Sequence, residues 1–299
     1  MPPISITWLP DAERRVRHVA VGEFDGVHLG HREVIRGADT ALTFEPHPLA
    51  VVAPGAAPKL LTSLEAKADL IAGLGVRELV VIPFDGDFAA QSPQTFIDDV
   101  LVGRLGAERV SVGENFRFGH RAQGDAALLR AQEAFETRVV ELVRVGGEVV
   151  SSSLIRGIVE AGDLARANSL LGAPFELRGV VAHGDKRGRT LGYPTANLVP
   201  DPAFVCPAFG VYACRAAIEA RGRWQQWPAA TSVGVRPTFV TGGGVLAEAF
   251  LLGFDGDLYG RELRLSFLAR LRGEERFDSV EALVAQMARD VEDTRRIAA

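Results

Sequence analysis

The first half of the chain alternates short apolar runs with longer amphipathic stretches. The apolar runs lack a strict alternation of apolar and polar residues, which is typical of strands in a sheet that is covered on both faces. Most are separated by stretches with helical spacing of apolar residues. This order predicts a doubly wound α/β sheet that binds ligands at the carboxyl ends of its strands. The expected strands are 16–21, 41–44, 78–83, 109–113 and 138–142, and the expected helices are 64–74, 93–105 and 125–136.

The second half of the chain has a different pattern. A helical stretch over 153–171 ends at Gly172-Ala173-Pro174. Between 175 and 267, short β-rich runs are separated by Gly and Pro, which is typical of a small antiparallel barrel or sandwich. The change predicts two domains, residues 1–172 and 173–299. The β-rich runs are 175–182, 210–217, 227–233, 247–254 and 261–268, and an amphipathic helix over 279–296 follows them.

Composition favours a soluble globular protein and makes several other classes less attractive. The 299 residues are 47% hydrophobic and 24% charged, and the net charge of −5 gives no reason to expect nucleic-acid binding. No apolar segment is long enough to span a bilayer and the N-terminus lacks a signal-peptide pattern, so we expect a cytoplasmic protein without a membrane partner. The two cysteines, Cys206 and Cys214, are expected to be free thiols.

The strongest chemical signal is a pair of histidines where the first expected strand gives way to a helix. His28 and His31 lie in the segment 22–31, near a helix N-terminus. Free backbone N–H groups and the helix dipole favour an anion there. Gly26 and Gly30 would let the backbone approach a ligand closely. The segment therefore predicts a phosphate site.

Two further motifs of the first half suit a flat ring. Thr43-Phe44-Glu45-Pro46-His47-Pro48 follows a strand, and its prolines fix the backbone around His47. Gly113-Glu114-Asn115-Phe116-Arg117-Phe118-Gly119 combines aromatic rings with the polar Asn115. Taken alone, the first motif is better explained as a Pro-rich turn. The second is equally well explained as a buried Phe pair beside a surface Arg.

A serine run opens the helical stretch between the two halves. The hydroxyls of Ser152 and Ser153 can cap the helix and also bind a phosphate oxygen. Arg156 returns to the face of Ser153, where it could neutralise a pyrophosphate. The simpler alternative is an ordinary helix cap with a solvated arginine.

The second half has its own candidate residues. Thr195 and Asn197 follow a basic loop and lie on one side of an extended segment, where their oxygens can coordinate Mg²⁺. A turn is the alternative. Glu248 lies in an otherwise apolar strand, where burying an unpaired carboxylate is costly. It is expected either to pair with Arg236 or Arg272, or to accept a proton from a substrate hydroxyl.

Together these motifs resemble the bacterial bifunctional FAD synthetases, which join a riboflavin kinase to an FMN adenylyltransferase. The histidine, proline, Asn-Phe and serine motifs occur in family order, and Gly192-Tyr193-Pro194-Thr195-Ala196-Asn197 is similar to the flavokinase module. The resemblance implies an N-terminal nucleotidyltransferase-type, Rossmann-like domain and a C-terminal six-stranded antiparallel barrel with a terminal helix. It also implies ATP, riboflavin, FMN and FAD as substrates or products, with Mg²⁺ as cofactor.

The resemblance implies a role for each candidate residue. His28, His31 and Arg156 would act in adenylyl transfer, and Glu248 would activate the riboflavin 5′-hydroxyl. The other residues implied to bind ATP and its phosphates are Gly22, Phe24, Asp25, Gly30, Ser152, Ser153, Gly184, Lys186, Arg189, Thr195 and Asn197, of which Thr195 and Asn197 would also hold the metal. The residues implied to bind flavin are Pro46, His47, Pro48, Asn115, Phe118 and Arg272.

Four features depart from the family pattern. Leu154 stands where the family usually has a further arginine, and only eleven residues separate His31 from Thr43, which predicts a short helix after His31. In the second half, Ser232 replaces the usual asparagine and Phe250 replaces a common histidine.

These departures leave more than one interpretation. The first is a bifunctional flavin enzyme. The second is an active riboflavin kinase beside a weakened, mainly nucleotide-binding N-terminal domain. The third is a regulatory protein that binds flavin or nucleotide without turnover, and the presence of all the expected catalytic residues argues against it. The expected partners are small-molecule substrates, and a homo-oligomer is compatible with the sequence.

Overall fold

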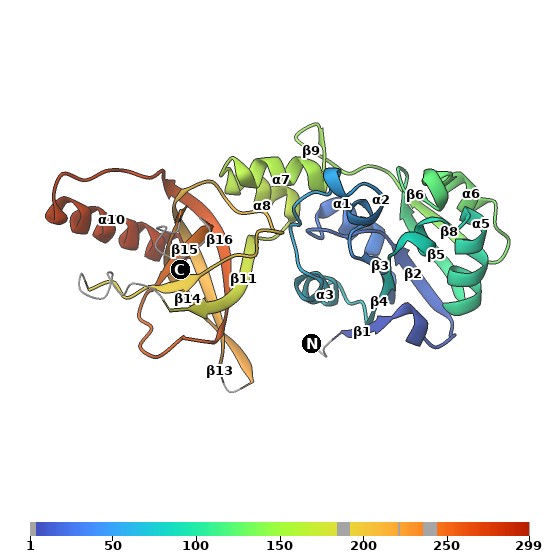
Figure 1. Cartoon of the computed structure of the whole chain (residues 1–299), viewed down its shortest axis with the longest axis horizontal. Coiled ribbons are helices and arrows are strands. Elements are labelled where there is room, and N and C mark those ends of the chain that lie inside the picture. The colour runs from blue at the N-terminus through green and yellow to red at the C-terminus, as the bar shows by residue number, and fades with distance from the viewer. Residues whose placement is uncertain (1–3, 184–191, 221, 236–243, 299) are drawn as a thin grey trace. The chain divides into compact units, whose positions relative to one another are not determined.

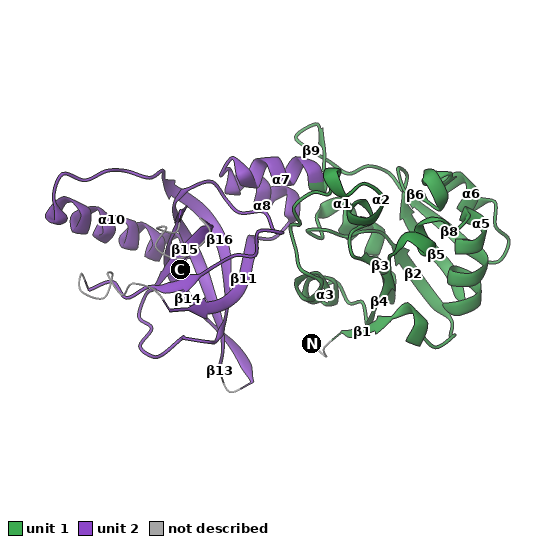
Figure 2. Cartoon of the chain, in the orientation of Figure 1, with its two compact units in different colours: residues 1–152 green, residues 153–299 purple. Residues whose placement is uncertain are grey.

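The computed structural model describes residues 4–183, 192–220, 222–235 and 244–298. The chain divides into two compact units, residues 1–152 and 153–299 (Figure 2). Helices α7 (Ser152–Glu160) and α8 (Leu164–Leu171) follow this division. The sequence-based domain boundary comes after both helices and stays a prediction. Each unit is described by itself below.

The first unit is built on a six-stranded sheet in the order β1-β4-β3-β2-β5-β8, in which all neighbouring strands are parallel (Figure 1). Successive residues of one strand enter different apolar clusters: Val19 and Val21 belong to one, and Ala20 to the other. The sheet is therefore covered on both faces, which confirms the doubly wound prediction. The strands are β1 (Ser5–Trp8), β2 (Arg17–Val21), β3 (Thr40–Glu45), β4 (Glu78–Pro83), β5 (Ala107–Gly113) and β8 (Glu136–Val140).

Helices and two small hairpins complete the first unit. The helix expected over 93–105 is a short α-helical turn followed by a π-helix, and the one expected over 125–136 ends at Arg130. The helices are α1 (Leu29–Ile35), α2 (Pro48–Val52), α3 (Leu64–Ala72), α4 (Gly86–Ala89), α5 (Pro93–Thr95), the π-helix Phe96–Arg104 and α6 (Ala126–Arg130). Single 3₁₀ turns are Leu9–Asp11, Pro54–Ala56 and His120–Ala122. The hairpins pair β6 (Arg117–Phe118) with β7 (Gly124–Asp125), and β9 (Arg144–Val145) with β10 (Glu148–Val149).

The second unit is a closed antiparallel barrel in the order β11-β12-β15-β14-β13-β16, as the resemblance implied. The helical stretch expected over 153–171 is two helices, because the chain turns at Gly162, whose φ is +81°. Both cysteines are free thiols, as predicted, and burial raises the pKa of Cys214 to about 12. The strands are β11 (Phe175–Ala182), β12 (Ala196–Leu198), β13 (Gly210–Ala220), β14 (Arg223–Val235), β15 (Val245–Leu251) and β16 (Glu262–Arg272), and α10 (Val280–Ala298) follows them.

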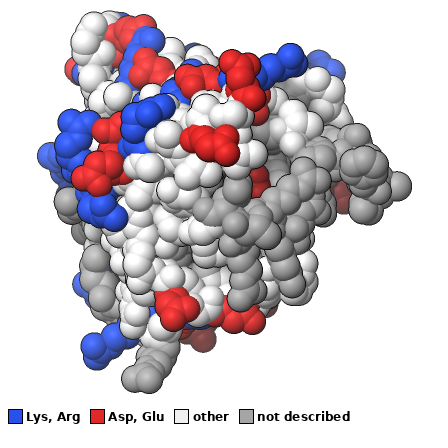
Figure 3. Space-filling view, turned by 90° about the vertical axis from the view of Figure 1, so that its left-hand side faces the viewer, with Lys and Arg blue, Asp and Glu red and all other residues white. Residues whose placement is uncertain are grey.

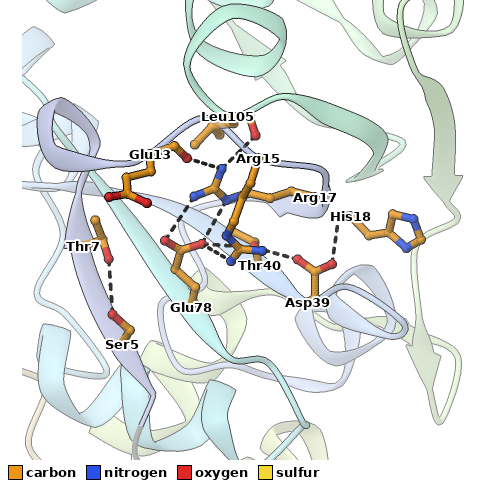
Figure 4. Close-up of polar contacts among 10 residues, drawn as sticks. All are labelled: Ser5, Thr7, Glu13, Arg15, Arg17, His18, Asp39, Thr40, Glu78 and Leu105. Atoms are coloured by element: carbon orange, nitrogen blue, oxygen red, sulfur yellow. Dashed lines mark hydrogen bonds and ion pairs between the residues drawn. The ribbon is translucent and has the colours of Figure 1, made fainter.

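A buried ion pair joins the amino ends of the strands in the first unit (Figure 4). Arg17 is 1% exposed, and two of its nitrogens donate to the Glu78 carboxylate over 2.9 and 3.2 Å. The same guanidinium donates to the carbonyl of Leu105 over 2.8 Å, while Arg15 donates to Glu78 over 2.6 Å. These contacts connect the first residues of β2 and β4 with the turn before β5. They lie at the amino ends of the strands. The sequence motifs occur at the opposite end of the sheet, after the carboxyl ends of the strands.

We predict that Glu78→Gln lowers the free energy of unfolding by about 3 kcal/mol at pH 7, because it leaves the buried Arg17 without a carboxylate. Glu136→Gln is the matched control, since the Arg109–Glu136 pair is exposed and contributes about 1 kcal/mol or less. Chemical denaturation followed by circular dichroism measures both. Equal losses for the two variants would contradict the prediction.

The Glu78→Gln variant also tests how the free energy of unfolding depends on pH. Burial alone would raise the pKa of Glu78, but hydrogen bonds and charges from Arg17 and Arg15 outweigh it and hold the pKa below its ordinary value. A lowered pKa in the folded state stabilises the protein above the pKa of the unfolded state, and this contribution is lost as the pH falls through the folded-state pKa. The stability difference between wild type and Glu78→Gln should therefore shrink on acidification below the ordinary glutamate pKa.

Candidate functional site

The two histidines of the first unit form one stacked pair at the start of α1. His28 is the N-cap of this helix, and its Nδ1 accepts the backbone N–H of His31 over 3.3 Å. The two rings stack with centroids 3.6 Å apart and planes 18° apart. Because Nδ1 is an acceptor, Nε2 carries the proton of a neutral His28 ring. An N–H group at Nε2 is suited to donate to a phosphate oxygen.

The loop before the pair, residues 22–27, is called the histidine loop below and has an unusual backbone. Phe24 and Val27 have φ values of 53° and 42°, in the left-handed region that β-branched Val avoids. Such conformations cost roughly 1–3 kcal/mol each and persist only where the surroundings impose them. The Phe24 side chain is 1% exposed and packs edge-on against the His31 ring, with centroids 5.4 Å apart. Its side chain therefore supports a histidine from the core.

Asp25 holds this loop in place. Its carboxylate is buried and accepts the backbone N–H groups of Leu61 and Thr62 over 2.9 and 3.0 Å, and the Thr62 hydroxyl over 3.2 Å. Its carbonyl accepts the Ser152 hydroxyl over 2.9 Å. The side chains of Phe24 and Asp25 thus position the loop, and their predicted contact with ATP stays a prediction.

Two glycines of the motif lie against aromatic rings of the same segment. A Cβ at Gly22 would lie 2.8 Å from the Phe24 ring, and one at Gly30 would lie 3.1 Å from the His28 ring. From the sequence, Gly30 is explained by the close approach of a ligand to the backbone. The structure shows that the space beside Gly30 is used by the first histidine ring.

The proline motif lies at the carboxyl end of β3. Strand β3 pairs with β2 as far as Leu42, whose carbonyl accepts the N–H of Gly22 over 3.1 Å just after the end of β2. His47 is the N-cap of α2, where its Nδ1 accepts the N–H of Leu49, and its Nε2 lies 4.0 Å from a carboxylate oxygen of Glu23. The neighbouring Pro46 is exposed and Pro48 is half-buried. The proline motif and the histidine loop are therefore adjacent at the carboxyl ends of two neighbouring interior strands.

The Asn-Phe motif follows β5. Asn115 is exposed, while Phe118 is 7% exposed and stacks on Phe116 with centroids 5.5 Å apart. Arg117 is exposed and pairs with Asp125 over 3.1 Å. Of the Phe pair that the alternative places beside a surface arginine, Phe118 is buried and Phe116 is half-buried. Flavin binding by Asn115 and Phe118 stays a prediction.

The serine run lies at the start of α7. Ser152 is joined to the histidine loop by its bond to Asp25, and Ser153 is exposed. Arg156 lies four residues after Ser152 on the same helix, in the second unit, and is half-buried, as is Leu154. Their predicted phosphate contacts stay predictions.

In the second unit, strand register brings the candidate residues together. Asn197 on β12 and Ser232 on β14 both lie opposite Glu248 on β15. Residues opposite each other in neighbouring strands share a face of the sheet. The three residues therefore form a row across three strands, called the polar row below.

Glu248 lies on the outside of the barrel. Its neighbours Ala247 and Ala249 are fully buried, whereas Glu248 is exposed. The expectation of a buried carboxylate is wrong, because residues alternate between the faces of a strand and the small alanines fill the interior positions. An exposed carboxylate in a row with polar residues is accessible to a substrate.

Phe250 fixes the Gly192–Asn197 segment against β15. Its ring packs edge-on against Tyr193, with centroids 5.2 Å apart. Thr195 follows two residues later and is half-buried, and Asn197 is 7% exposed. Phe250, which stands where the family commonly has histidine, thus helps to place the Thr195–Asn197 pair beside Glu248.

Arg272 has a structural partner. It donates to the Asp290 carboxylate of α10 over 2.8 and 3.1 Å, and Asp290 is 5% exposed. Gln286 donates to the same carboxylate over 2.9 Å. Arg272 therefore anchors α10 to β16, and its role toward flavin stays a prediction. The predicted residues Gly184, Lys186 and Arg189 lie outside the described residues, as does Arg236.

Two buried or contacting residues of the first unit, Thr62 and Lys67, are absent from the sequence-based predictions. Thr62 contacts Asp25 from 37 positions away, and no local pattern indicates this. Lys67 is buried, three residues after Leu64 and four before the buried Ile71. A lysine on the apolar face of the expected helix was the available signal.

Two features are absent from the described residues, a metal-binding group of side chains and a membrane-spanning helix. These residues contain no group of three or more His, Cys, Asp or Glu side chains that could hold a metal ion. Within the same residues, every helix is too short or too polar to cross a membrane.

Comparisons with known proteins cover both units. A family model for FAD synthetase matches residues 11–154, and one for riboflavin kinase matches residues 171–298. The chain is 38% identical to a bifunctional riboflavin kinase/FMN adenylyltransferase of Listeria monocytogenes, over 93% of this chain and 91% of the relative. It is 39% identical to the protein of the same name in Escherichia coli K12, over 91% and 90% of the two chains.

A solved structure is also similar. A crystal structure described as a macrolide-efflux protein from Streptococcus pneumoniae has a TM-score of 0.87 and 32% identity, over 98% of this chain and 99% of that chain. The family assignment comes from the extent of the sequence matches to curated relatives. On this evidence the chain belongs to the family of bifunctional riboflavin kinase/FMN adenylyltransferases.

Proposed function

We propose that the second unit phosphorylates riboflavin to FMN with ATP, and that the first unit adenylylates FMN to FAD with release of pyrophosphate. The observation that carries the proposal is that each unit brings its motif residues to one place. The first unit stacks His28 on His31, and the second places Asn197 beside Glu248.

In adenylyl transfer, a phosphate oxygen of FMN attacks the α-phosphorus of ATP and the bond to the β-phosphate breaks. The protein supplies no covalent step, so catalysis depends on positioning and on neutralising charge. The Nε2–H of His28 suits a phosphate oxygen, and His31 is held one helical turn away. Ser152, Ser153 and Arg156 are proposed to hold the departing pyrophosphate, and the proline motif is proposed to hold the flavin side.

In phosphoryl transfer, the riboflavin 5′-hydroxyl attacks the γ-phosphorus of ATP. Glu248 is proposed to accept the hydroxyl proton, because it is exposed in the polar row. Thr195 and Asn197 offer hard, neutral oxygens beside it, which fit Mg²⁺ together with substrate phosphates. When bound there, Mg²⁺ would neutralise phosphate charge.

A second candidate function has one observation in its favour. Helix α1 has only seven residues, as the short spacing after His31 predicted. Fewer peptide units add to its dipole, which favours a weakened first unit beside an active kinase. The stacking and capping of His28 do not require a longer helix, so we favour the bifunctional interpretation.

The partners are proposed to be these small molecules, in the cytoplasm. The net charge is −5, and on the face drawn in Figure 3 basic and acidic side chains are interspersed. Among the residues that the structure describes, these side chains form no continuous positive surface on that face, unlike the basic patches that bind nucleic acid.

One assay tests the proposal. The purified protein is incubated with riboflavin, ATP and Mg²⁺, and the flavins are then separated and quantified. Formation of both FMN and FAD is expected. FMN without FAD supports the weakened first unit, and the absence of both products contradicts both functions.

His28→Ala should lower the conversion of FMN to FAD by roughly a hundredfold, because it removes a phosphate donor and the partner of the His31 ring. Riboflavin phosphorylation in the same sample should be unchanged. His120→Ala is the matched control, an exposed histidine of the same unit. An equal loss of both activities in a folded His28 variant would contradict the assignment.

Glu248→Gln should have the opposite effect. It keeps the size of the side chain but removes the proton acceptor, so riboflavin phosphorylation should fall by about a hundredfold or more. Added FMN should still be converted to FAD at the wild-type rate. Glu262→Gln, at an exposed glutamate of another barrel strand, serves as control. Unimpaired phosphorylation by Glu248→Gln would rule out its role as base.

A further inference from the structure

Lys67 is a buried cation of the first unit that the proposed chemistry does not use. It lies on α3 and is 4% exposed. Its Nζ donates one hydrogen bond, to the Thr43 hydroxyl over 3.2 Å, and makes no ion pair with any described residue. An ammonium has three donors, and burying it with one neutral partner is costly. Lys67 therefore calls for an explanation other than stability.

Thr43 connects Lys67 to the histidine loop by a second hydrogen bond. The Thr43 side chain is fully buried, and its hydroxyl donates to the carbonyl of Glu23 over 3.0 Å. A hydroxyl has one proton and can rotate, whereas an ammonium only donates. The contact with Lys67 therefore requires Thr43 to accept from Nζ, which leaves its proton for the Glu23 carbonyl.

The two ends of this link belong to different motifs. Glu23 lies between Gly22 and Phe24 in the histidine loop, and Thr43 opens the proline motif. Because Lys67 belongs to a third element, α3, it fixes the contact between the two motifs from outside both.

The charge of Lys67 also acts on the proline motif. Burial raises the pKa of Glu45, and the nearby Lys67 opposes this while Glu65 adds to it. Glu45 precedes the exposed Pro46 directly. Lys67 thus favours the ionised form of a carboxyl group inside the motif.

We propose that Lys67 is a positioning residue for adenylyl transfer, which through Thr43 and the Glu23 carbonyl sets the distance between the histidine loop and the proline motif. This inference rests on the proposed function, in which the loop holds ATP and the proline motif holds FMN. Each substrate contacts its own motif, so an error in the distance between them impairs the alignment of the reacting atoms more than the binding of either substrate.

The first test is Lys67→Met, which keeps an unbranched side chain as far as Cε and removes the ammonium group. For conversion of FMN to FAD, kcat should fall about tenfold or more, while the KM values for ATP and FMN change less than about threefold. The unfolding midpoint should stay unchanged or rise, because an apolar side chain replaces a buried cation. A purely structural lysine would instead lose activity only in proportion to lost stability. Lys59→Met is the matched control, at an exposed lysine.

The second test breaks the same link at Thr43. Thr43→Val removes the hydroxyl and should lower kcat as Lys67→Met does, whereas Thr43→Ser keeps the hydroxyl and should retain most of the wild-type rate. The Lys67→Met/Thr43→Val double variant should be no slower than the slower single variant, because both changes break one link. If Lys67→Met fails to fold, the comparison of Val with Ser at position 43 decides.

The outcomes separate this inference from the function on which it rests. Wild-type protein that makes no FAD from FMN overturns the proposed function and the inference with it. Active wild type with an unchanged kcat in Lys67→Met, or with equal rates for Thr43→Val and Thr43→Ser, overturns the role of Lys67 alone. Riboflavin phosphorylation by the same samples shows that each preparation is active.

Discussion

The buried carboxylate of Asp25 accepts hydrogen bonds from three donor groups, the two N–H groups of residues 61 and 62 and the Thr62 hydroxyl, and the Asp25 carbonyl accepts the Ser152 hydroxyl. These bonds hold a loop in which two residues without glycine's freedom have positive φ. Because that loop ends at the His28 cap, the stacking of the two histidine rings depends on it. The first site is therefore set by a buried carboxylate that need not itself touch a substrate.

The second unit positions its candidate residues in a different way. Its candidate residues need no strained loop, because antiparallel register places Asn197, Glu248 and Ser232 in one row. The interior of the barrel takes the alternate residues, so the polar row is directed outward. A packed aromatic pair, Tyr193 and Phe250, then holds the neighbouring segment against the same strand. One chain thus positions two sites, by buried hydrogen bonds in one unit and by strand register in the other.

The sequence predicted the features that depend on local patterns of apolar and polar residues. The interior strand β4 was predicted with its bounds, because both of its faces are buried and its residues are apolar, whereas the bounds of β2, β3 and β5 differ from the prediction by one or two residues. Strand β1 was missed because it lies at an edge of the sheet and is largely exposed, and β12 because it has only three residues. The contacts of Asp25 with Thr62 and of Lys67 with Thr43 join residues far apart in the chain, so no periodicity reveals them. Glu248 was expected to be buried because the run around it is apolar, although its alanine neighbours occupy the interior.

The central claim is that buried contacts of the histidine loop, independent of the polar row, control the proposed adenylyl transfer. The most direct measurement is the ratio of the two activities of Asp25→Asn in one sample, with the unfolding midpoint showing that the variant is folded. An asparagine offers one acceptor oxygen and directs N–H groups at backbone donors. The account predicts that FAD formation from FMN falls at least about tenfold while riboflavin phosphorylation keeps its wild-type rate. An unchanged ratio of the two activities would contradict it.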